Sequence, residues 1–84
     1  MRTVREEPKF QEQLEALAVD FQRLDEVMRG VHISLCLKPE TFEKIGPLSV
    51  LKTDMYPGAP ALRIFFTYTA TEVHLLFVEF AEYA

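Results

Sequence analysis

The stretch ALRIFFTYTATEVHLLFVEF, residues 61–80, decides the fold of this 84-residue chain. It is rich in Tyr, Phe, Thr, Ile and Val, the residue types that suit a pleated, half-buried surface. Apolar side chains recur along it with the two-residue period of a β-strand. The pattern predicts two antiparallel strands joined by a tight turn at Ala70-Thr71.

The same alternation predicts which side chains face the core. One face of the expected hairpin is almost entirely apolar and should form the floor of the core. Its residues are Leu62, Ile64, Phe66, Tyr68, Val73, Leu75 and Phe77, with Glu79 at its end. The opposite face is mixed in character. Its residues are Arg63, Phe65, Thr67, His74, Leu76, Val78 and Phe80. A slip of one residue would exchange the two sets, so the apolar pattern itself fixes the register.

The N-terminal half of the chain has a helical pattern that begins after Pro8, a residue suited to the first turn of a helix. Apolar side chains follow at alternating spacings of four and three residues, which is a helical stripe. They are Phe10, Leu14, Leu17, Phe21, Leu24, Met28 and Val31. The stripe fits packing on the sheet, and it also fits a coiled-coil seam, for which three heptads are near the minimum. Residues 1–7 would either add an edge strand or fray.

The helical pattern leaves two alternatives open. No Gly or Pro lies between Pro8 and Gly30, so the region could be one long helix or two. Gly30 is the first helix-breaking residue. Beyond it, residues 31–37 alternate like a strand and also continue the helical stripe, and periodicity alone does not decide between these.

The middle of the chain is expected to connect the helices to the hairpin. Pro39 ends the helical element, because the residue before a proline avoids the helical region. Residues 38–47 form a connector with one helical turn at 41–44. Residues 48–55 alternate as a strand, and residues 56–60 have the composition of a turn.

Composition limits the class of protein. The chain is 49% hydrophobic and 26% charged, as expected for one globular domain spanning residues 1–84. It has no apolar run of membrane-spanning length and no signal-peptide pattern, so we expect a cytoplasmic protein that does not bind membranes. Cys36 is the single cysteine, and no metal-ligand spacing or glycine-rich phosphate loop is present. The sequence therefore predicts no metal and no cofactor.

A helical N-terminal half, the end of a second helix at residues 37–40, the strand 62–66 and the final strand 73–78 together resemble the RelE/ParE family of small toxins from bacterial toxin–antitoxin modules. The resemblance implies an α+β fold, with an N-terminal helical hairpin (or one long helix) packed on a small antiparallel sheet of three to four strands. It implies a helix break near residues 19–22. It also implies endoribonuclease activity and an antitoxin as protein partner.

The C-terminal strand departs from the family pattern. Ribosome-dependent members end this strand with a histidine followed by paired lysines, and the matching positions here are Phe77, Glu79, Ala81 and Glu82. Acidic side chains there would repel RNA phosphates. We therefore expect a RelE/ParE-like protein of the toxin–antitoxin class with weak or no ribonuclease activity, acting through a protein partner. The alternatives are a non-catalytic interaction or homodimerisation domain and, more weakly, an active endoribonuclease.

Three residues are candidates for catalysis in the endoribonuclease alternative. Arg63 lies in an apolar strand, where a guanidinium needs an acceptor or an exposed face. It would either pair with a carboxylate or clamp a phosphate or carboxylate on an open sheet face. The carboxylates considered are Glu79, Glu82 and Asp54. His74 shares the predicted face of Arg63 and can exchange a proton near neutral pH. Tyr83, near the C-terminus, is the third candidate.

The mixed face of the hairpin also predicts an interface. It carries four large apolar residues, too many for the solvated face of a monomer. They are Phe65, Leu76, Val78 and Phe80. A partner helix, an antitoxin or a second copy of the chain would cover them.

The net charge predicts weak binding of nucleic acid. Nine basic residues face thirteen acidic ones, and residues 62–84 hold one Arg, no Lys and three Glu. Because affinity grows with the number of phosphates neutralised, RNA and DNA should bind weakly at physiological salt. Fluorescence anisotropy with labelled single strands measures this. Tight binding that weakens steeply with salt would contradict the prediction.

Overall fold

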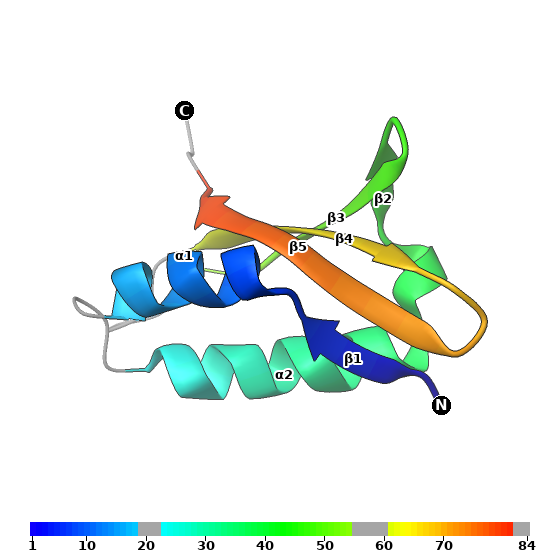
Figure 1. Ribbon diagram of the computed structural model, residues 1–84, viewed down its shortest axis with the longest axis horizontal. Helices are drawn as coiled ribbons and strands as arrows, with labels where there is room; N and C mark the ends of the chain where they lie inside the picture. The colour runs from blue at the N-terminus through cyan, green and yellow to red at the C-terminus, as the bar shows by residue number, and fades with distance from the viewer. Residues whose placement is uncertain (19–22, 55–60, 82–84) are drawn as a thin grey trace.

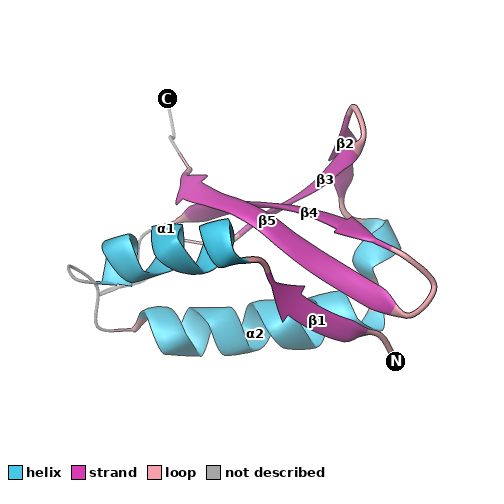
Figure 2. Ribbon diagram, in the orientation of Figure 1, coloured by secondary structure: helices cyan, strands magenta, loops and turns pink. Residues whose placement is uncertain are grey.

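The computed structural model describes residues 1–18, 23–54 and 61–81. The elements in chain order are β1 Thr3–Glu6, α1 Pro8–Ala18, α2 Leu24–Leu37, a 3₁₀ turn η1 Pro39–Thr41, β2 Glu43–Ile45, β3 Leu48–Lys52, β4 Leu62–Tyr68 and β5 Glu72–Phe80. The strands form one sheet in the order β1-β5-β4-β3-β2, and both helices lie on one side of it (Figures 1 and 2). The predicted α+β class is therefore confirmed.

The β4–β5 hairpin turns at Ala70-Thr71, as predicted. The N–H of Thr69 donates to the carbonyl oxygen of Glu72 at 2.8 Å. The Thr69 hydroxyl oxygen accepts hydrogen bonds from the N–H groups of Thr71 at 3.3 Å and Glu72 at 3.1 Å. A threonine side chain thus organises a turn that contains no glycine.

The predicted register of this hairpin is correct from Tyr68–Val73 to Phe66–Leu75 and wrong beyond Leu75. A β-bulge inserts Leu76 as an extra residue, because the next pair after Phe66–Leu75 is Phe65–Phe77. The alternation of β5 therefore changes phase. The four residues whose predicted faces are exchanged are Phe77, Val78, Glu79 and Phe80.

The physical reason for the bulge lies in what it buries. Without it, Glu79 would lie opposite Leu62 in the core, where a carboxylate without a partner is costly. With it, Glu79 lies opposite Arg63, and Val78 lies opposite Ile64. Val78 is only 4% exposed and belongs to the core.

The core fills the space between the helices and the sheet. Phe10 of α1 is fully buried in it. Helix α2 contributes the last three residues of the predicted stripe and one further residue. These are Leu24, Met28, Val31 and Leu35. They pack within the chain, so the coiled-coil alternative is wrong for them. Phe21 of the predicted stripe lies outside the described residues.

The helical half consists of two helices. Helix α1 begins at Pro8 as predicted and ends at Ala18, and α2 begins at Leu24. The predicted break at residues 19–22 lies outside the described residues. Residues 31–37 belong to α2, so the helical alternative is correct there. The helix passes through Gly30, whose expected role as a breaker is wrong, because packing of α2 on the core overrides the weak propensity of one glycine.

The helices differ from the expected hairpin in how they pack. Helix α1 packs principally along β5, whereas α2 lies across the sheet beside β1 (Figure 1). At the edge of β5 beyond β1, the Gln13 side-chain oxygen accepts a hydrogen bond from the N–H of Val78 at 2.9 Å. Helix α1 thus satisfies strand backbone that β1 is too short to reach.

The sheet has five strands and is mixed, so the prediction of three to four antiparallel strands is wrong. Strand β1 pairs in parallel with residues 72–75 of β5, which makes residues 1–7 an edge strand over part of their length. The helical turn expected at residues 41–44 is observed as the 3₁₀ turn Pro39–Thr41, and β2 occupies residues 43–45. It leads into β3 through Gly46, whose φ of 61° favours glycine. The strand predicted over 48–55 is observed over 48–52. Met55 and the predicted turn at 56–60 lie outside the described residues.

Replacing Phe66 by Ala should destabilise the protein by about 3–5 kcal/mol, because the side chain is fully buried and its loss leaves a cavity. Phe65→Ala is the matched control. The Phe65 side chain lies half-buried on the opposite face of the sheet, so its removal should reduce stability much less. Urea unfolding followed by circular dichroism measures both. Equal losses of stability would contradict the assigned faces.

Candidate functional site

We call the surface of the sheet opposite the helices the outer face. The strand registers place the side chains of this face in rows. Val50 of β3 lies opposite Phe65 of β4, and Phe65 lies opposite Phe77 of β5. On the other side of Val50 lies Glu43 of β2. Three apolar side chains from three strands thus lie side by side at the centre of the outer face.

The outer face carries an apolar patch. We define the patch by the residues Ile45, Leu48, Val50, Phe65 and Phe77. Ile45 is 54% exposed and Phe77 is 37% exposed, whereas Leu48 and Phe65 are half-buried. Val50 is only 6% exposed although no described helix covers this face. Contiguous apolar surface of this kind often marks a binding site for another protein.

The predicted interface residues are only partly on this face. Phe65 lies in the patch. Leu76 is the half-buried extra residue of the bulge, directly before Phe77 in the sequence. The predicted outer-face positions of Val78 and Phe80 are wrong, because the bulge turns both toward the helix side. Phe77 takes their place and was assigned to the core. One sequence signal for the exchange of faces was available. An ion pair between Arg63 and Glu79 requires the two residues on the same face, and strict alternation along β5 places them on opposite faces.

Arg63 lies on the outer face and is held by a carboxylate. Its Nη1 lies 3.2 Å from Oε1 of Glu79, the residue opposite it on β5. The two side chains are 30% and 53% exposed, and an ion pair this exposed contributes about 0–1 kcal/mol. Pairing with a carboxylate, one of the two alternatives for this residue, is therefore what the structure shows. Of the other carboxylates considered, Glu82 lies outside the described residues.

His74 is surrounded by acidic groups. Its Nδ1 lies 3.0 Å from Oε1 of Glu7, and its Nε2 lies 3.6 Å from Oε1 of Glu72. Glu72 also pairs with Nε of Arg5 on β1. The imidazole thus links β5 to the junction between β1 and α1.

The predicted catalytic residues do not converge. His74 lies opposite Thr67, four residues along β4 from Arg63, which separates the two backbones by about 13 Å. Tyr83 lies outside the described residues. Within residues 1–18, 23–54 and 61–81, no group of three or more His, Cys, Asp or Glu side chains is arranged to hold a metal ion.

The second histidine, His32, contacts the same junction between β1 and α1 from the side of α2. Nε2 of His32 on α2 lies 2.7 Å from Oε2 of Glu6. Two consecutive glutamates, Glu6 and Glu7, thus bind two histidines from two different elements. These contacts attach β1 both to α2 and to β5, which is a structural role that sequence periodicity did not reveal.

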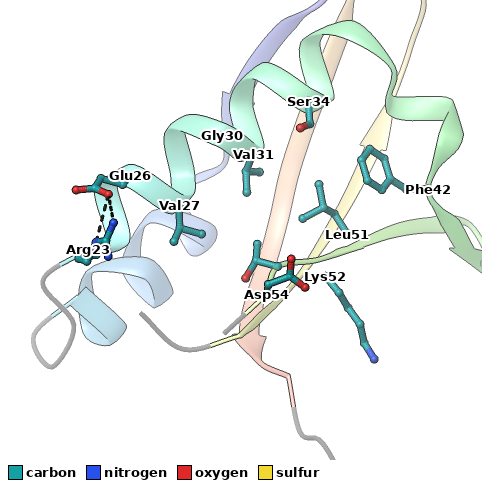
Figure 3. A pocket seen from close by; sticks show the side chains of 11 residues that line it. Arg23, Glu26, Val27, Gly30, Val31, Ser34, Phe42, Leu51, Lys52 and Asp54 are labelled. Atoms are coloured by element: carbon teal, nitrogen blue, oxygen red, sulfur yellow. Dashed lines mark hydrogen bonds and ion pairs between the residues drawn. The ribbon is translucent and has the colours of Figure 1, made fainter. Parts of the chain in front are cut away.

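An open groove of about 440 Å³ lies between α2 and β3, on the helix side of the sheet (Figure 3). Its lining combines apolar side chains with polar and charged ones. The apolar wall residues are Val27 and Val31 of α2, Phe42, and Leu51 of β3. At one end Arg23 pairs with Glu26 at 2.8 Å. The volume falls within the range of small-molecule sites, but neither Arg63 nor His74 lines it. Sequence reasoning missed it because its walls come from elements far apart in the chain.

Substituting Glu at two consecutive positions tests the phase of β5. Phe77→Glu should fold, because the side chain is already partly in solvent and a carboxylate there would lie near Lys9, whose Nζ lies 5.3 Å from the ring centroid. Val78→Glu should unfold the protein, because it forces a carboxylate into the core. Thermal unfolding followed by circular dichroism compares the two. Similar melting of both variants would show that the bulge is misplaced.

No helix in the described part of the chain is long and apolar enough to cross a membrane.

The chain matches no protein-family model, no curated protein and no solved structure. What can be inferred about its activity therefore rests on its own residues and their geometry.

Proposed function

We propose that this chain is a RelE/ParE-like protein of the toxin–antitoxin class that binds a protein partner through the outer face of its sheet and has weak or no ribonuclease activity. The apolar patch on this face carries the proposal. Both helices pack on the opposite side, so the exposed members of the patch, Ile45 and Phe77, are accessible to a second molecule (Figure 1).

The charges around the patch support binding rather than catalysis. A catalytic arginine must bind a phosphate, and Arg63 would have to exchange its contact with Glu79 for that phosphate. A general base needs a ring nitrogen that faces the substrate, whereas Nδ1 of His74 bonds Glu7 and its Nε2 lies 3.6 Å from Glu72. An RNA backbone laid on the outer face would meet these three carboxylates beside cations that they already pair with, and the net charge of −4 would repel it.

The layout of the face resembles that of a protein interface. The apolar row from Val50 to Phe77 lies between the Arg63–Glu79 pair on one side and the His74–Glu72 contact on the other. An apolar centre with a polar rim is the usual anatomy of an interface between proteins. In the resemblance to RelE/ParE toxins, the partner is an antitoxin. A homodimerisation domain is the second candidate, and it is favoured by the opposite charges at the two edges of the outer face, Glu43 on β2 and Lys9 on α1.

The absence of catalysis is tested with RNA, both free and bound to ribosomes. Cleavage by the purified protein should not exceed that by the Arg63→Ala/His74→Ala double variant, because these side chains are engaged within the protein. Gel analysis of end-labelled RNA measures it. Cleavage that disappears in the double variant would refute the proposal and establish a nuclease.

Partner binding is tested with the product of the reading frame next to this gene, the place where an antitoxin would be encoded. Isothermal titration calorimetry should show binding that Phe77→Glu removes. Ile33→Glu is the matched control, because Ile33 is 55% exposed on α2, away from the outer face. Equal effects of the two substitutions would place the partner elsewhere.

A further inference from the structure

We infer that a second copy of this chain can occupy the outer face, with the two copies related by a two-fold axis that lies between the sheets and runs parallel to the strands. The inference builds on the proposed role of the outer face as a binding surface. It rests on a row of residues that has opposite charges at its two ends.

The row runs across the whole outer face. Its order follows from the strand registers and one ring contact, and it reads Glu43, Val50, Phe65, Phe77, Lys9. Glu43 is exposed on β2 at one edge of the sheet. Lys9 is exposed on α1 at the other edge, with its ammonium group over the Phe77 ring. Phe65 lies at the centre of the row.

The two charges at the ends of the row differ from Arg63 and Arg5 in having no ion-pair partner among the described residues. Arg63 pairs with Glu79, and Arg5 pairs with Glu72. Within the described residues, neither Lys9 nor Glu43 forms an ion pair in its own chain. The row therefore has an acidic group at one edge and a basic group at the other, with apolar side chains between them.

A two-fold axis parallel to the strands matches this row to itself. Rotation about this axis reverses the order of the strands in the second copy and leaves each residue at the same height along the strands. Phe65 therefore faces Phe65 of the second copy, and every other residue of the row faces the one at the same distance on the other side of Phe65. Glu43 then faces Lys9 of the second copy at both ends, and Val50 faces Phe77. An axis perpendicular to the strands would instead set Glu43 over Glu43 and Lys9 over Lys9, which repel. The charges thus select one orientation of an isologous dimer.

The dimensions fit two packed sheets of modest size. From β2 to β5 the row crosses three strand spacings, about 14 Å in all, and packed sheets lie about 10 Å apart. A surface of this extent lies at the lower end of specific interfaces. We therefore expect a dimer that forms in the micromolar range and dissociates on dilution.

Charge reversal at the ends of the row tests the orientation. Lys9→Glu and Glu43→Lys each place like charges at both ends of the dimer, so each should weaken self-association by about tenfold or more. When the two variants are mixed in equal amounts, a heterodimer has opposite charges at both ends, so association should recover. Analytical ultracentrifugation over a dilution series measures all three samples and the unchanged protein.

The substitutions themselves should leave the fold intact. Glu at position 9 lies in the first turn of α1, where the helix dipole favours an acidic side chain. Lys at position 43 lies on a short edge strand, where lysine is common. Glu15→Lys and Arg29→Glu are matched controls, because both side chains are exposed on the helices. Neither control, alone or mixed, should change the association.

The outcomes separate this inference from the proposed function. If the unchanged protein stays monomeric at every concentration, or if the mixed variants do not associate, the inference is overturned. The proposed function then still stands or falls by its RNA and partner measurements. If RNA is cleaved by Arg63 and His74, the proposed function fails, whereas recovery of association in the mixture would still establish the dimer.

Discussion

The β-bulge at Leu76 is the constraint on which the rest of the structure depends. A strand of strict alternation would send Glu79 into the core and leave Val78 in solvent. One extra residue reverses both placements, at the expense of one unpaired position in the ladder. It thereby completes the core, gives Arg63 its carboxylate and leaves Phe77 at the centre of the outer face. The core and the candidate binding surface thus share one cause.

The N-terminal segment is positioned by the same strand. Strand β1 covers only residues 72–75 of β5, and Gln13 of α1 satisfies the N–H of Val78 beyond it. Glu6 and Glu7 then fasten the junction between β1 and α1 to His32 and His74. Because Lys9 follows directly, its place over the outer face depends on this junction. His74, which the sequence predicted as a catalytic residue, therefore links β5 to the junction between β1 and α1 in the structure.

The two faces of the sheet divide the chemistry of the protein. The helix side holds the core and the groove between α2 and β3, whereas the outer face holds the apolar patch and the end charges. In the described residues, nothing on either face brings Arg63 and His74 to one reacting atom. The outer face combines apolar area with ordered charges, which is the combination that gives both affinity and orientation to a protein contact.

The sequence by itself determined the features that depend on neighbours in the chain. These are the helix start at Pro8, the apolar stripe, the turn at Ala70-Thr71 and the faces of the hairpin up to Leu75. Only the tertiary structure decided the parallel pairing of β1, the helical state at Gly30, the bulge and the groove. Each of these depends on contacts between distant segments. Periodicity reports how side chains alternate along one element, whereas the phase of β5 is set by the energy of burying Val78 and of pairing Glu79 across the sheet.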